Sequence, residues 1–265
     1  MDDTSLEYNE ENDVENSDSQ LPKKFPGFGK SWLWLILFFG IYFVGLALYF
    51  FGYGIVVGVQ HAELAGTGEL ESLAQELIEK HSASAVGISG AYITMFFLLM
   101  PVLYMASKFK YQSWKDTLGI HRFAPKDLYV WFGILSVFFL IQMGVLGLID
   151  PPLTEFTEVV VSSKSMLFAA VMIFFAPFLE ELVFRGYLFK AWRHTFLGLS
   201  GTLVLTSLLF SALHFGQYHW STMTFLFVLS LILGISREKT GSVLVPIILH
   251  SANNLAAIIV AYLAF

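Results

Sequence analysis

The chain of 265 residues is 56% hydrophobic and only 14% charged, and it contains 27 phenylalanines and no cysteine. Soluble domains average about 45–50% apolar residues, so this composition excludes a disordered protein, a nucleic-acid binder and an ordinary soluble enzyme. The formal net charge of −6 comes from the N-terminus, where eight acidic residues fall within the first twenty positions. The sequence therefore predicts a polytopic membrane protein without disulfides or cysteine-bound metals.

The N-terminus is predicted to be a disordered, acidic, cytosolic tail over residues 1–30. Its first 22 residues are rich in Asp, Glu, Asn and Ser and nearly lack apolar side chains, so they cannot bury enough surface to offset the entropy of ordering. The tail has neither the basic start nor the early apolar core of a signal peptide. The rest of the chain, residues 31–265, is expected to form one transmembrane helical domain.

Apolar stretches predict an all-α fold, a polytopic transmembrane bundle of about seven spans, because a span needs about 20 mostly apolar residues. Between the first two stretches, leucine and isoleucine share one face of residues 69–81, which predicts an amphipathic helix at the membrane interface. Tyr187, Trp192 and Trp220 are expected as interfacial aromatic residues. The seven candidate spans, of which the fifth and sixth are short, are residues 32–57, 85–106, 128–149, 166–189, 199–214, 222–235 and 243–265.

The distribution of Lys and Arg predicts the orientation of these spans. If the N-terminus is cytosolic, twelve basic residues lie in cytosolic segments and only Lys80 and Lys164 lie in external loops, while Arg185 falls inside a span. Cytoplasmic loops of membrane proteins carry such an excess of basic residues. We therefore expect a multi-pass cell-membrane protein with a cytosolic N-terminus, an external C-terminus and an odd number of spans.

Ionisable side chains inside the spans are confined to the C-terminal half, and the interiors of spans one to three contain none. Each such group costs several kcal/mol in hydrocarbon, so a cluster indicates a functional site. The candidate site residues are Glu180, Glu181 and Arg185 in the fourth span, His214 at the end of the fifth, and His250 and Asn254 in the seventh.

Helical spacing predicts different roles for the two glutamates. Glu181 and Arg185 are four residues apart, so they can pair along one helical face, and we interpret them as a structural ion pair within the candidate site. Glu180 lies about 140° around the helix from Arg185. Its carboxylate is therefore expected to remain free to titrate.

Two chemistries fit the remaining polar groups. A carboxylate beside imidazoles can hydrolyse an amide bond, with Glu180 and His214 activating water while His250 and Asn254 donate hydrogen bonds to the oxyanion. Alternatively Glu180, His214 and His250 could bind zinc, with a water as fourth ligand. The spacing of these residues fits either interpretation equally well. His250 and Asn254 share a helical face, and Phe210 is expected to lie beneath His214.

Three motifs in order, EExxxR, FxxxH and HxxxN, resemble those of the CPBP family, which comprises CAAX prenyl endopeptidases and bacteriocin-processing enzymes and is also called Abi. The resemblance covers about residues 166–257, the expected catalytic core. It implies an α-helical intramembrane endopeptidase with a cavity open to the cytosol and a membrane-embedded or membrane-bound peptide or protein as substrate. By the family pattern Glu180 and His214 activate water and His250 and Asn254 form the oxyanion site. Members have been described both as metalloproteases and as metal-independent glutamate proteases. We favour the metal-independent reaction, which needs no cofactor, because Asn254 is a poor zinc ligand and no third histidine is available. Bacterial members are linked to bacteriocin immunity and peptide maturation.

Two other functions fit the same polar residues. In a proton-coupled or ion-coupled transporter, Glu180 and the histidines would relay protons or bind the substrate. The chain shows no inverted repeat to support this function. A catalytically silent scaffold for a partner membrane protein is the second alternative.

Overall fold

The computed structural model describes residues 27–108 and 113–264, and within these residues the fold is helical, without a β-strand. The predicted all-α class is therefore confirmed. Residues 1–26 lie outside the described part, and with them most of the predicted acidic tail. The first helix begins at Phe28, so the last three residues of the predicted tail are helical.

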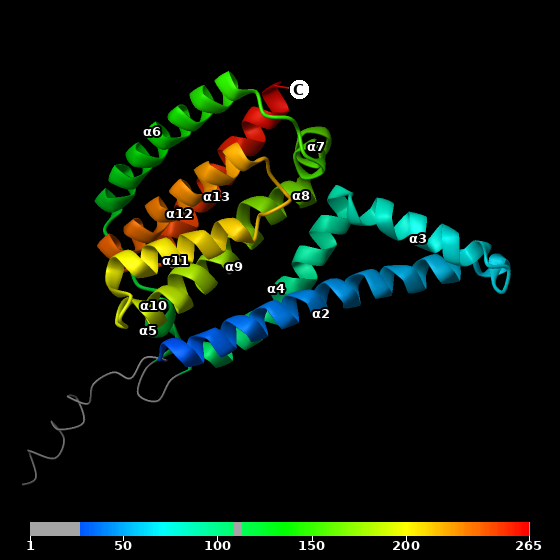
Figure 1. The fold of residues 1–265 in the computed structure, drawn as a ribbon, viewed down its shortest axis with the longest axis horizontal. Helices are drawn as coiled ribbons and strands as arrows, with labels where there is room; N and C mark the ends of the chain where they lie inside the picture. Colours follow the sequence, from blue (N-terminus) through cyan, green and yellow to red (C-terminus); the bar gives the residue numbers. More distant parts are fainter. Residues whose placement is uncertain (1–26, 109–112, 265) are drawn as a thin grey trace, which may run out of the picture.

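The N-terminal half forms a layer of long helices along one side of the molecule (Figure 1). In it α4 packs against α2, and α3 folds back along the far part of α2. The predicted helix at residues 69–81 is confirmed as α3, and its position at a membrane surface stays a prediction. The elements of this layer are α2 (Phe28–Gln60), η2 (Ala62–Leu64), α3 (Glu69–Ser82) and α4 (Ala85–Ser107). Next in the chain are the short α5 (Trp114–Leu118) and then α6 (Pro125–Ile149), which lies with the C-terminal bundle.

The C-terminal half forms a bundle in which α12 lies between α11 and α13, and α6 packs against α12 and α13 (Figure 1). Short helices α7 and α8 connect α6 to this bundle. The elements are α7 (Glu155–Ser162), α8 (Met166–Ala170), η3 (Val171–Phe175), α9 (Ala176–Glu181), η4 (Leu182–Leu188), α10 (Phe189–Arg193), α11 (Gly198–Ala212), α12 (Trp220–Thr240) and α13 (Leu244–Ala264).

Local sequence signals set several helix ends. The Ser84 hydroxyl accepts a hydrogen bond of 3.0 Å from the backbone of Gly87 at the start of α4, and Thr154 forms a capping box with Thr157 before α7. At the end of α5, Gly119 has φ 71°, a left-handed conformation that costs glycine little. The backbone carbonyl of this turn accepts a bond of 2.8 Å from Val243, which joins α5 to the start of α13.

Six helices among the described residues are long and apolar enough to cross a membrane. Many of their large apolar side chains face outward, such as Val59, 72% exposed, and Leu148, 88% exposed, a surface that suits a lipid environment. The protein is therefore a multi-pass membrane protein. The predicted fifth span corresponds to α11, whose 15 residues reach only about 22 Å, so a seventh span stays a prediction. The predicted sixth span is longer than expected, because α12 continues through 21 residues.

The helix that carries both glutamates is irregular. From Met166 to Arg193 the chain is helical throughout, but wide π-helical turns, η3 and η4, stand directly before and after the six residues of α9. Pro177 follows η3 and has no backbone N–H, so it cannot donate the hydrogen bond that would close a regular α-helical turn with the residues before it. Such wide turns occur often at functional sites, and here they flank Glu180 and Glu181.

The N-terminal layer is fastened to this helix near its end. The Trp192 indole donates a hydrogen bond of 2.7 Å to the Ser31 hydroxyl, and its ring stacks on Trp32 with centroids 5.4 Å apart. The expectation that Tyr187 and Trp192 are interfacial aromatic residues is wrong, because both are fully buried where α2 covers η4 and α10. Trp220, in contrast, is 68% exposed.

Candidate active site

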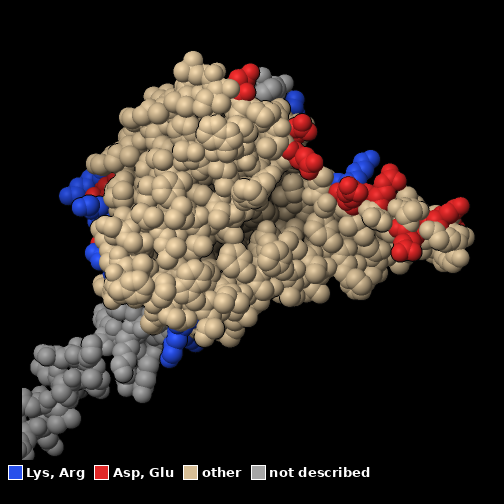
Figure 2. Space-filling model, in the orientation of Figure 1, with Lys and Arg blue, Asp and Glu red and all other residues tan. Residues whose placement is uncertain are grey.

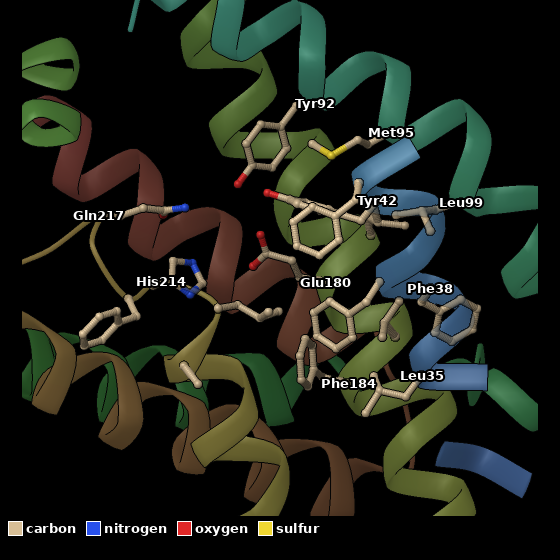
Figure 3. Close-up of a pocket in the computed structure, with 17 residues that line it drawn as sticks. Leu35, Phe38, Tyr42, Tyr92, Met95, Leu99, Glu180, Phe184, His214 and Gln217 are labelled. Carbon is tan, nitrogen blue, oxygen red and sulfur yellow. The ribbon is translucent and has the colours of Figure 1, made fainter. Parts of the chain in front are cut away.

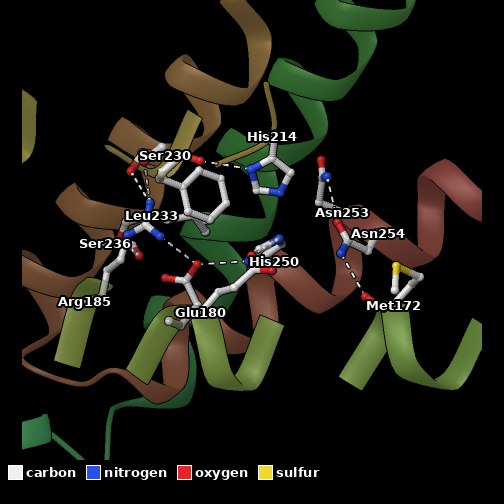
Figure 4. A network of polar contacts seen from close by, with 12 residues as sticks. Met172, Glu180, Arg185, His214, Ser230, Leu233, Ser236, His250, Asn253 and Asn254 are labelled. Atoms are coloured by element: carbon white, nitrogen blue, oxygen red, sulfur yellow. Dashed lines mark hydrogen bonds and ion pairs between the residues drawn. The ribbon is translucent and has the colours of Figure 1, made fainter. Parts of the chain in front are cut away.

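A fully buried ion pair lies at the centre of the C-terminal bundle. Arg185 donates from Nη1 to Glu181 Oε1 at 2.8 Å, and both side chains are inaccessible to solvent. The other terminal nitrogen of Arg185 donates to the carbonyl and the hydroxyl of Ser230 on α12, at 2.9 and 2.6 Å (Figure 4). The predicted pairing is therefore confirmed, and the pair also ties η4 to α12.

The same carboxylate oxygen of Glu181 accepts a hydrogen bond from His250 Nδ1 at 2.9 Å. A carboxylate carries no proton to donate, so Nδ1 of His250 is the protonated nitrogen. The opposite ring nitrogen, Nε2, lies 4.0 Å from Glu180 Oε2. His250 on α13 thus lies between the two glutamates of α9, and its bond to Glu181 fixes its orientation. Figure 4 shows His250 next to Glu180.

Glu180 faces a cavity of about 410 Å³ that lies between the N-terminal layer and the C-terminal bundle. This volume is within the usual range of ligand pockets. Most of its wall is apolar and comes from α2, α4 and the end of α9, and His214 closes one side (Figure 3). Since successive helical residues point about 100° apart, Glu180 enters the cavity while Glu181 turns into the buried network.

His214 does not lie in a helix as expected, because α11 ends at Ala212. It follows in the turn, where its Nδ1 lies 2.9 Å from the Phe210 carbonyl oxygen. A carbonyl only accepts, so Nδ1 carries the proton and Nε2 is left to act as acceptor in the neutral ring. The predicted aromatic support is confirmed, since the rings of Phe210 and His214 are 5.0 Å apart.

Asn254 is held away from Glu180. Its amide nitrogen donates to the Met172 carbonyl on η3 at 2.9 Å, and its oxygen accepts from Asn253 at 3.4 Å (Figure 4). Among the described residues that line the cavity, neither Asn254 nor His250 is found. The structure therefore brings Glu180 and His214 into one cavity, with His250 behind Glu180 and Asn254 farther along α13.

The donors considered for zinc are not arranged as a metal site. Within residues 27–108 and 113–264, no three His, Asp or Glu side chains are gathered closely enough to hold a metal ion. Glu180, His214 and His250 therefore do not fit a zinc ion in this arrangement.

Two tyrosines that no charged motif of the sequence indicated also line the cavity. Tyr42 on α2 and Tyr92 on α4 direct their hydroxyl groups toward Glu180, and Gln217 extends from the turn after α11 (Figure 3). Nearby, burial and then the charge of Glu180 raise the pKa of Tyr218. A tyrosine in an otherwise apolar span could have indicated these residues, because the hydroxyl group of a buried tyrosine usually has a hydrogen-bond partner.

With this geometry in place, comparison with known proteins assigns the C-terminal part of the chain. Residues 162–256 match the Rce1-like type II CAAX prenyl endopeptidase family. These residues form an Rce1-like domain of the CPBP family. The family is one of hydrolases, with protein substrates. The matched range includes all six candidate site residues, and the helices from α8 to α12 lie within it.

A curated protein is similar to part of the chain. An uncharacterized 24.3 kDa protein of Escherichia coli is 36% identical over 77 residues, which are 28% of this chain and 35% of that protein. The chain thus covers about a third of this relative's length. No solved structure matches the chain.

Proposed function

We propose that this protein is an intramembrane endopeptidase that hydrolyses peptide bonds of membrane-associated peptides or proteins. One observation carries the proposal: Glu180 and His214, from separate elements of the Rce1-like domain, face the same cavity. Family membership implies this class of activity. The cavity wall is mostly apolar, which suits a substrate segment that reaches the site from the lipid.

In the proposed reaction, water binds between Glu180 and the free Nε2 of His214. The Glu180 carboxylate takes a proton from this water while the water oxygen bonds to the scissile carbonyl carbon. The π electrons of the carbonyl group move to the carbonyl oxygen, which becomes the oxyanion. When the resulting oxyanion collapses, the C–N bond breaks, and Glu180 returns its proton to the leaving amine. The water contributes an OH group to the new carboxyl group and its other hydrogen to the amine, so atoms and charge balance.

We assign the oxyanion site to His250 and Asn254, as expected from the sequence. His250 fills this role in its doubly protonated form, in which Nδ1 donates to Glu181 and Nε2, which lies 4.0 Å from Glu180 Oε2, carries the second proton. Asn254 has a second amide hydrogen besides the one it donates to Met172. Glu181 and Arg185 act in this proposal as positioning residues, since both are buried and neither lines the cavity.

We further propose that the domain spans the membrane seven times, with α11 as the short fifth span, a cytosolic N-terminus and an external C-terminus. The charge distribution supports this orientation. Visible Lys and Arg side chains gather mainly at the end that holds α5 and α10, while acidic side chains gather over α3 and near α7 (Figure 2). In this arrangement residues 31–265 form one domain with its catalytic core at 166–257.

Bacteriocin immunity or peptide maturation is the biological role that the family suggests.

The test is incubation of the purified protein with membrane peptides, followed by mass spectrometry of the products. Glu180→Gln and His214→Ala should each lower cleavage about 10²–10⁴-fold, while Glu158→Gln, an exposed carboxylate on α7, should leave it unchanged. Full cleavage by Glu180→Gln would contradict the water-activation role. Substrate counterflow in vesicles without any cleavage would instead support a transporter, and full cellular function of an inactive variant would support a scaffold.

A further inference from the structure

The cavity brings together two tyrosines from different helices of the N-terminal layer, α2 and α4. Tyr42 lies in the first half of α2 and Tyr92 near the start of α4, and both line the same cavity as Glu180. Their hydroxyl groups approach Glu180 from the side opposite to the C-terminal bundle (Figure 3). Both phenols are within electrostatic reach of the Glu180 carboxylate.

Neither hydroxyl has a hydrogen-bond partner among the residues that the structure describes. A half-buried phenol in an apolar wall normally has such a partner. Tyr49 shows the usual behaviour on the same helix, since its hydroxyl lies 2.9 Å from His81 Nε2. Two phenols that share one cavity and have no protein acceptor among the described residues are available to donate hydrogen bonds to an oxygen of a molecule bound beside Glu180.

The donors on the opposite side are partly engaged, because each gives one of its protons to a protein acceptor. His250 gives its Nδ1 proton to Glu181, and Asn254 gives an amide proton to Met172. A carbonyl oxygen bound in the cavity beside Glu180 would therefore meet the phenols of the N-terminal layer directly. Tyrosine hydroxyls are among the side-chain donors that stabilise oxyanions in acyl-transfer reactions.

We propose that Tyr42 and Tyr92 donate hydrogen bonds to the oxygen of the scissile carbonyl as it becomes an oxyanion, in addition to the donors of the C-terminal bundle. This inference rests on the proposed endopeptidase function. It assigns a catalytic contribution to a part of the chain outside residues 162–256, the matched family domain. It also explains why the N-terminal layer is fastened to the catalytic helix through Ser31 and Trp192, because α2 must hold Tyr42 in register with Glu180.

The ring positions are suited to this task. Both tyrosines pack on the buried core formed by α2, α4 and η4, and Tyr92 also packs on the cluster around Phe168. Packed rings hold their hydroxyl groups in place before the substrate arrives, which is what makes such donors effective.

The experiment compares Tyr42→Phe, Tyr92→Phe and the double variant with wild type, because phenylalanine keeps the ring and removes only the hydroxyl. Tyr53→Phe on α2 and Tyr104→Phe on α4 are matched controls outside the cavity. Cleavage of a membrane peptide gives kcat and KM. Each cavity variant should lower kcat about 10²-fold with little change in KM, as for other oxyanion donors, and the controls should retain wild-type values.

A second measurement uses a phosphinic peptide, whose tetrahedral anionic group resembles the oxyanion. Tyr42→Phe and Tyr92→Phe should weaken its binding about 10²-fold, and binding of an uncleaved amide peptide to a Glu180→Gln background should not change. Melting in detergent should stay at the wild-type temperature. Equal kcat and equal phosphinate binding in all variants, with an active wild type, would overturn this inference alone. A wild type that neither cleaves peptides nor binds the phosphinate would overturn the proposed function as well.

Discussion

Glu181 and His250 are joined across α9 and α13 by a hydrogen bond of 2.9 Å from Nδ1 to Oε1. Arg185 donates to the same oxygen at 2.8 Å, so one buried carboxylate oxygen connects three helical segments. The neighbouring residue, Glu180, is left to face the cavity. Adjacent glutamates thus differ in surroundings, one fully buried and paired, the other beside His214 with 18% of its side chain exposed.

The first prediction concerns the buried pair. Arg185→Ala leaves the Glu181 carboxylate buried beside His250 without its strongest donor, so the free energy of unfolding should fall by about 3–5 kcal/mol. Yield and melting temperature in detergent measure this effect. Arg193→Ala, which removes an ion pair at the partly exposed Glu238, is the matched control and should cost no more than about 1 kcal/mol. An Arg185→Ala protein with full stability but no cleavage would place the arginine at the substrate instead.

The second prediction separates hydrogen bonding from metal binding at His250. If its Nε2 acts as a hydrogen-bond donor, His250→Gln should retain part of the activity, because an amide can still donate. Chelators should then leave the wild type active. Loss of stoichiometric zinc together with activity in His250→Gln, and recovery of chelator-treated enzyme by zinc, would support the alternative in which this histidine is a ligand.

The third prediction concerns Asn254. If its second amide hydrogen serves the oxyanion, Asn254→Ala should lower kcat about 10²–10³-fold with little change in KM. If the amide only joins α13 to the Met172 carbonyl, the same change should lower the melting temperature and leave kcat nearly unchanged. Asn253→Ala serves as the neighbouring control, because that side chain contacts Asn254 and does not line the cavity.

The fourth prediction concerns pH and the contact between α2 and α3. Burial lowers the pKa of His81 below its ordinary value of 6.5, and the ring stacks on Tyr53 at 3.8 Å. A lowered pKa means that the folded state favours the neutral ring. The contribution of this ring to stability is therefore complete above the pKa of the unfolded state, and it is lost as pH falls through the pKa of the folded state. Hydrogen exchange of α3 amides should therefore reveal easier opening as pH falls from about 7.5 to about 5. His81→Gln should remove this pH dependence.

The fifth prediction concerns membrane orientation. Reporter fusions after Lys110, which lies outside the described residues, and after Lys239 should be cytosolic, because basic loops remain inside. Fusions near Glu71 on α3 and at the C-terminus should be external. A cytosolic C-terminus would show that α11 does not cross the membrane, which would leave the six long apolar helices as the spans.

Much of this protein follows from local sequence. Apolar stretches identified the long helices, because a span must satisfy its backbone internally and present hydrocarbon to lipid. The i, i+4 spacing identified the Glu181–Arg185 pair, and the order of three motifs indicated the CPBP resemblance that residues 162–256 confirm. The i, i+4 spacing also predicted the ring of Phe210 beside His214, since both residues lie within one turn of chain.

Contacts between distant segments were decided only by the tertiary structure. Helical spacing cannot show that Glu181 also binds His250, 69 residues away, or that Asn254 donates to Met172. The aromatic character of Trp192 predicted a place at the membrane interface, whereas packing of α2 buries this residue. Tyr42 and Tyr92 carry no charge and so give no strong signal in an apolar helix, yet the approach of α2 and α4 to α9 brings them to Glu180. The sequence determined which segments are helices and which side chains are costly in a membrane, because both depend on nearest neighbours. Which of those side chains meet depends on how the helices pack.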